Sequence, residues 1–208
     1  MAWDKGFNFR KTSAYVADGA DETYVLGDSE GDYPITRNGV TFGWGESTDV
    51  GSDDRNSGID RRLAGINYTI QTTKVCPFLV DLPSSGDYTI RLAEGDYGSA
   101  QGNQWVEFFD NTTSLFTVNN TAVAQATYYD ATNTNYSTAN WPGNNTAVQK
   151  TFATTTFKMV IGKATGTGYT VIAHLFISQV AGGGFVPYPL GEERGARGGL
   201  KVLSGGLQ

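Results

Sequence analysis

Apolar and polar side chains alternate most regularly between residues 78 and 96. The apolar members form two sets, one on each side of a break: Phe78, Val80, Leu82, Tyr88, Ile90 and Leu92. A period of two is typical of strands that bury one face. The break contains Pro83, which cannot donate to a ladder, and Gly86, which tolerates a positive φ. We therefore predict a β-hairpin whose apolar face belongs to the core.

Shorter alternating runs predict further strands along the chain. They lie near residues 7–9, 24–26, 40–44, 66–70, 104–109, 114–118, 156–161 and 169–180. The runs at 104–109 and 114–118 flank turn residues and predict a second hairpin. The run at 169–180 is apolar on both faces, which is typical of a central strand. Residues 127–145 show no period and predict a long loop, a kind of segment that is often functional.

Composition supports an all-β fold. The 208 residues include 27 Gly, and 12% are aromatic whereas only 17% are charged, which favours short strands joined by turns. Because no linker divides the chain before residue 180, we expect one β-sandwich domain over residues 1–180. A Gly-rich arm follows over residues 181–208.

The arm carries apolar and basic side chains on a Gly-rich backbone. We expect these residues to contact neighbouring subunits: Phe185, Tyr188, Leu190, Arg194, Arg197, Leu200, Val202 and Leu203. Such a segment cannot offset its own ordering entropy, so a partner is expected to hold it, in a homo-oligomer or a larger assembly.

Charge and hydropathy exclude several classes of partner. The net charge of −6 argues against a nucleic-acid binder, which needs a basic surface to displace counterions from phosphates. The chain begins without a signal-peptide pattern and holds no apolar run of membrane-spanning length, so membrane insertion is not expected. The single cysteine, Cys76, excludes an intrachain disulfide and favours a buried thiol over an interchain bridge.

Catalytic patterns are weak, and we assign no catalytic residue. His174 is the only histidine and sits in an apolar run, and no nucleophile elbow occurs. A thiolate pair of Cys76 with His174 would need adjacent strands. Two carboxylates in a cleft could cleave a glycosidic bond, and Glu94, Asp96 and Glu107 are available for such a pair, but residues of this kind flank strands in most sandwiches. We expect a non-enzyme.

Acidic loops raise the question of a metal. Asp49, Asp53 and Asp54 lie close together in sequence, and carboxylates are ligands that Ca²⁺ prefers. Their spacing matches no EF-hand loop. A solvated acidic loop is therefore the favoured interpretation, with Ca²⁺ as the alternative and no other cofactor expected.

Aromatic residues beside polar loops are the stronger binding signal. Sugar C–H groups stack on aromatic rings while hydroxyl groups pair with polar side chains. Trp44, Trp105, Tyr136 and Trp141 are candidates for such a carbohydrate platform. Core packing is the alternative for Trp44 and Trp105, whereas Tyr136 and Trp141 are expected to be exposed.

Several groups of residues, in order, resemble the galactose-binding-like β-sandwiches. They are Phe7-Asn8-Phe9, Gly43-Trp44, Asp54-Arg55, residues 60–65 and residues 78–96. The chain is most similar in this respect to malectin-like domains and to carbohydrate-binding modules of rhamnogalacturonan-degrading enzymes. The resemblance implies a jelly-roll sandwich that binds sugars or acts as a structural spacer, and it implies no catalysis.

Two functions are consistent with these features. The first is a structural or decoration protein on the surface of a phage virion, with the sandwich exposed and the arm docked on neighbouring subunits. The second is a free, extracellular carbohydrate-binding module. The two are compatible if the decoration protein binds glycans on a host cell surface.

Overall fold

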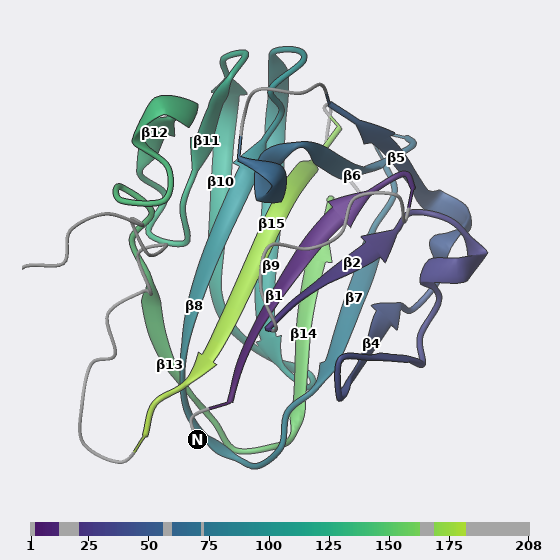
Figure 1. Ribbon diagram of the computed structural model, residues 1–208, viewed down its shortest axis with the longest axis vertical. Helices are drawn as coiled ribbons and strands as arrows, with labels where there is room; N and C mark the ends of the chain where they lie inside the picture. The colour runs from purple at the N-terminus through teal and green to yellow at the C-terminus, as the bar shows by residue number, and fades with distance from the viewer. Residues whose placement is uncertain (1–2, 13–20, 56–59, 72, 163–168, 182–208) are drawn as a thin grey trace, which may run out of the picture.

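Two β-sheets packed face to face form the part of the chain that the computed structural model describes, which is residues 3–12, 21–55, 60–71, 73–162 and 169–181 (Figure 1). The larger sheet has nine strands: β12 (Asn135–Ser137), β11 (Thr127–Tyr129), β8 (Gly86–Gly95), β15 (Val171–Gln179), β1 (Asp4–Arg10) and β2 (Glu22–Leu26) in order, with β13 (Val148–Phe152) beside β8, β6 (Gly65–Thr69) beside β15, and β5 (Val50–Asp54) beside β6. The smaller sheet has six: β10 (Thr113–Val123), β9 (Gln101–Asp110), β14 (Thr156–Ile161), β7 (Cys76–Asp81), β4 (Val40–Trp44) and β3 (Ile35–Arg37). The described helices are single 3-10 turns: η1 (Ser29–Gly31), η2 (Ser47–Asp49), η3 (Arg61–Leu63) and η4 (Thr138–Asn140). The predicted all-β sandwich is confirmed.

The core between the sheets centres on the ring of Phe78. This ring lies 5.2 Å from the rings of Phe9 and Trp44 and 5.5 Å from that of Phe7, measured between centroids. All four side chains are fully buried. Phe7 and Phe9 belong to the larger sheet and Phe78 and Trp44 to the smaller one, so aromatic contacts join the two layers.

The predicted hairpin at residues 78–96 is wrong in its pairing, although both of its strands exist. β7 pairs with β4 and β14 in the smaller sheet, whereas β8 pairs with β15, β13 and β11 in the larger one. The chain therefore crosses from one sheet to the other between residues 82 and 85. Two strands that face each other across a core bury the same alternate positions as two that pair side by side, so the pattern could not distinguish these arrangements. The six alternating apolar side chains are buried, as predicted.

Other predicted elements are confirmed. β9 and β10 form the second hairpin, and Asn111 turns the chain with a φ of 52°. β15 is the predicted central strand, because it pairs with both β1 and β8 and buries both of its faces.

The segment at residues 127–145 is not the structureless loop expected. It forms β11, β12 and η4, which lie at one side of the larger sheet (Figure 1). Its rings of Tyr128, Tyr136 and Trp141 stack in series with centroids 5.9 Å apart. These rings belong to a second apolar cluster with Ala93, whose side chain faces away from the main core because its neighbour Leu92 faces into it. The segment thus covers part of the outer face of the larger sheet.

The two faces of β7 are expected to differ in how much their side chains stabilise the fold. Phe78→Ala should lower the free energy of unfolding by about 3–5 kcal/mol, because it leaves a cavity among the rings of Phe7, Phe9, Phe42 and Trp44. Leu79→Ala, on the half-buried outer face of the same strand, should cost only about 1 kcal/mol. Denaturant unfolding of both variants measures the difference, and equal losses would contradict the assignment of the inner face.

Candidate functional site

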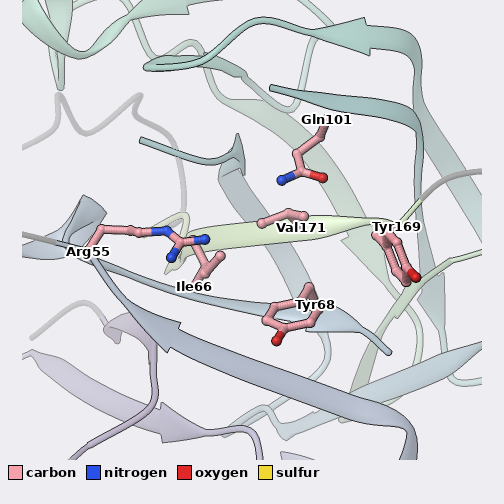
Figure 2. Close-up of a pocket in the computed structure, with 6 residues that line it drawn as sticks. All are labelled: Arg55, Ile66, Tyr68, Gln101, Tyr169 and Val171. Atoms are coloured by element: carbon pink, nitrogen blue, oxygen red, sulfur yellow. The ribbon is translucent and has the colours of Figure 1, made fainter. Parts of the chain in front are cut away.

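A pocket opens on the outer side of the larger sheet near the start of β15. Six residues line it: Arg55, Ile66, Tyr68, Gln101, Tyr169 and Val171. Figure 2 shows Val171 in the middle, with Arg55 and Tyr169 at opposite ends and Gln101 and Tyr68 on opposite sides. β6 and β15 set this geometry, since Val171 pairs directly with Tyr68. The cavity volume is about 130 Å³, below the about 300–1,000 Å³ of pockets that enclose a drug-sized ligand.

The guanidinium of Arg55 is held in place by two carboxylates. Its Nε and one terminal nitrogen each donate to Asp96 at 2.7 Å, and its other terminal nitrogen donates to Asp53. Asp96 is fully buried and also accepts from the backbone N–H of Gly98 at 2.7 Å and from the hydroxyl of Ser99 at 3.0 Å. The bidentate pair therefore fixes a planar cation at one end of the pocket.

These contacts shift the pKa values of the pair in opposite directions. Burial opposes the ionised form of Asp96, but the hydrogen bonds from Arg55 and Gly98 outweigh it and hold the pKa of this carboxyl below its ordinary value. The hydrogen bond to Asp96 raises the pKa of Arg55. With Asp53 included, the group carries one positive and two negative charges, so the pocket has no excess of positive charge for an anionic ligand.

Tyrosine rings supply the apolar surface of the pocket. Tyr169 is 45% exposed and Tyr68 is half-buried. Tyr68 lies directly against β5, where a Cβ on Gly51 would come within 2.5 Å of the ring. Glycine at position 51 therefore allows this ring position.

Contacts with β9 anchor the segment that carries Tyr169. The side chain of Gln104 donates to the carbonyl of Tyr169 and accepts from the N–H of Val171 at 2.7 Å. The hydroxyl of Thr170 accepts from the N–H of Trp105 at 3.0 Å. Tyr169 is thus an exposed ring on a fixed backbone, which lowers the entropy cost of stacking a ligand on it.

Sequence reasoning missed this pocket. Arg55 is one of the residues that carry the resemblance to galactose-binding-like sandwiches, and Tyr68 lies in the strand predicted near residues 66–70. The sequence assigns a role in binding to neither of them. Arg55 and Asp96 are separated by 41 positions, and no periodicity links them. No motif or period in the sequence distinguishes Tyr169 from the rest of the apolar run at residues 169–180.

The four aromatic residues predicted as a platform do not come together. Trp44 is fully buried among core rings, and Trp105 is half-buried on the outer face of the smaller sheet. Tyr136 and Trp141 lie on the larger sheet. The expected exposure of Tyr136 is wrong, since it is only 3% exposed and stacks between Tyr128 and Trp141. Trp141 is half-buried.

The three aspartates for which calcium binding is the alternative interpretation have separate partners. Asp49 pairs with Lys74 at 2.8 Å, and Asp53 pairs with Arg55. Asp54 accepts from the N–H of Lys11 and the hydroxyl of Thr12. Among the described residues, no group of three His, Cys, Asp or Glu side chains is placed to hold a metal ion.

The two nucleophile and base candidates lie apart. Cys76 is buried in the smaller sheet, where burial raises the pKa of its thiol to about 12. His174 is buried on the larger sheet, with its Nε2 3.1 Å from a carboxylate oxygen of Glu22 and its ring 5.4 Å from that of Trp141. They share no strand pairing, so the thiolate pair is not formed.

The three carboxylates considered for glycoside cleavage are all engaged. Asp96 binds Arg55, and Glu107 accepts from the hydroxyl of Ser114 at 2.6 Å. Glu94 is fully buried and accepts from the side-chain amide of Asn120 at 2.7 Å. Desolvation raises the pKa of Glu94 to about 8.

Two further expectations concern the ends and the surroundings of the chain. Most of the predicted assembly arm, residues 182–208, lies outside the described residues. Within the described residues, no helix has the length and apolar character needed to span a membrane.

Comparison with known proteins shows a similarity of fold. No family model matches the chain, and no curated protein is similar to it in sequence. Protein YXIM of Bacillus subtilis superposes with a TM-score of 0.50 and 13% identity over 86% of this chain. This chain spans only 40% of that protein's length. The predicted sandwich is thereby confirmed as a known fold.

Carbohydrate-binding modules are also among the similar structures. A family 35 module from Clostridium thermocellum has a TM-score of 0.37 and 11% identity, covering 66% of this chain and 90% of the module. A family 35 module from Cellvibrio japonicus Abf62 has a TM-score of 0.38 and 15% identity, covering 62% and 81%.

The buried carboxyl of Glu94 predicts a pH dependence of stability. Because its folded pKa exceeds the unfolded value, the folded protein retains a proton that the unfolded chain has lost between pH 4.5 and about 8. The free energy of unfolding should therefore fall as pH rises through this window, by up to about 1.4 kcal/mol per unit. Glu94→Gln should remove this part of the slope while keeping the acceptor for Asn120. Denaturant titrations of both proteins between these pH values provide the test, and identical slopes would show that Glu94 does not titrate in this range.

Proposed function

We propose that the protein is a non-enzymatic module that binds a neutral sugar residue of a glycan in the Arg55 pocket. The observation that supports this most is the combination of two tyrosine rings with a fixed planar cation beside Gln101. Rings stack on sugar C–H faces, and amide and guanidinium groups pair with hydroxyls. The cavity volume of about 130 Å³ suits insertion of one end of a glycan, with the rest of the chain outside.

A neutral ligand follows from the charges of the pocket. The positive charge of Arg55 is offset by Asp96 and Asp53, so a uronate carboxylate would meet two like charges beside one opposite charge. We therefore expect hexose or deoxyhexose residues to bind more tightly than uronates.

A role on a phage particle is less well supported by the described residues. It depends on the arm, of which residues 182–208 lie outside them, and the similar structures named above include no virion protein. The pocket, in contrast, lies entirely within the described chain. The free carbohydrate-binding module is therefore the function we propose.

Binding should depend on the ring of Tyr169. A glycan array followed by calorimetry on the best ligand should show about a tenfold loss of affinity for Tyr169→Ala, which corresponds to one stacking contact of about 1.4 kcal/mol. Tyr33→Ala is the matched control, because this half-buried tyrosine lies beside the smaller sheet and binds Asp81. Equal losses in both variants, or no binding to any neutral glycan, would refute the proposal.

Chelation of divalent metals should leave glycan binding unchanged. Asp49, Asp53 and Asp54 bind separate partners, so no described group of carboxylates requires Ca²⁺. The same calorimetric titration with and without a chelator measures this. A loss of binding that added Ca²⁺ restores would contradict the expectation.

A further inference from the structure

The edge strand β10 stands out among the strands of the smaller sheet. It has 11 residues, and within the described chain it pairs only with β9. Its sequence, Thr113 to Val123, contains no charged residue, no proline and no glycine. An edge of this kind presents unpaired N–H and C=O groups in a row and is a template for pairing with another strand.

The other sheet edges carry features that discourage such pairing. β3 and β12 have three residues each, and β5 ends in Asp53 and Asp54. β2 is covered by side chains, since Arg37 donates to the carbonyl of Tyr24 at 3.0 Å and Asn38 donates to that of Glu22 at 2.7 Å. β13, which pairs only with β8, has five residues and carries Lys150, whose ammonium lies 5.4 Å from the ring of Phe116 on β10. Among the described edge strands, β10 is the longest, and none of its own residues is charged.

We infer that β10 is a self-association surface, on which two copies of this chain pair antiparallel to form a symmetric dimer. A second copy fits this edge because it presents the same uncharged strand, and antiparallel pairing about a twofold axis makes one strand complementary to itself. The two smaller sheets then continue into a single sheet of twelve strands.

The ladder between β10 and β9 sets the register of this pairing. It is interrupted between Ser114 and Phe116, and Asn103 on β9 has a φ of 48° near the other end. The stretch of regular pairing in between runs from Phe116 to Asn120 and is centred on Val118. A twofold axis at Val118 gives the largest overlap of both strands and places Thr117 of one copy opposite Asn119 of the other.

The side chains at these positions make the pairing selective and testable. Thr117 and Asn119 are exposed, whereas Val118 is buried in the core. Both exposed side chains therefore lie on the solvent face, where directly opposed residues interact across strands. Both side chains are uncharged, so the proposed interface contains no repulsion between like charges at these positions.

Charge substitutions on the full-length chain test the inference. Light scattering coupled to size exclusion should give the wild-type protein twice the chain mass of 22.3 kDa. The variant Thr117→Lys with Asn119→Lys should give the single-chain mass, because lysines of the two copies then oppose each other at both positions. Its fold should persist, since Thr117 lies opposite Glu107 on β9.

The variant Thr117→Lys with Asn119→Glu is the matched control. It introduces as many charged side chains at the same positions but places lysine opposite glutamate in the proposed register, so it should remain a dimer. Thr36→Lys, exposed on the opposite edge of the same sheet, should also remain a dimer.

Three results would overturn the inference. A wild-type protein with the single-chain mass at all concentrations excludes the dimer and leaves another segment or chain as the occupant of the edge. A double-lysine variant that stays dimeric places the interface elsewhere. A monomeric Thr117→Lys, Asn119→Glu variant contradicts the twofold register at Val118.

Discussion

Aromatic packing around Phe78 holds the two sheets at a fixed distance, and the outer faces keep their shape because of it. The inward positions of β1, β4 and β7 are committed to this cluster, with rings such as Phe7 and Trp44 fully buried. Polar chemistry is therefore confined to outer faces, strand ends and edges. The Arg55 pocket lies at strand ends, and β10 lies at an edge, so neither competes with the core for side chains.

Strand positions were largely predictable because a half-buried strand must alternate. The residues of β4 and β14 match the predicted runs, and the two-sided burial of β15 matches its apolar character. The pairing partner of each strand was less predictable. β7 and β8 carry the pattern of a hairpin yet belong to different sheets, because alternation records which side is buried and not which strand lies alongside.

The pocket was harder to predict than the fold. Its cation depends on an ion pair between Arg55, just after β5, and Asp96, just after β8, and only the folded topology brings these together. The exposure of aromatic residues was difficult to predict for the same reason. Trp44 and Tyr136 are residue types that sugar-binding surfaces use, but both are buried. Packing of the two sheets buries Trp44, and the cover formed by residues 127–145 buries Tyr136.

The hydrogen bonds of Arg55 have a consequence for selectivity. Three of its five N–H donors are already used by Asp96 and Asp53. A ligand in the pocket would therefore meet two tyrosine faces but few free donors. Ring faces respond to the shape and hydration of a sugar more than to the orientation of one hydroxyl, and apolar contacts separate close analogues by only about 10–200-fold. A module built this way would tolerate several epimers, and it would gain discrimination from repeated weak contacts along a polymer rather than from one tight subsite.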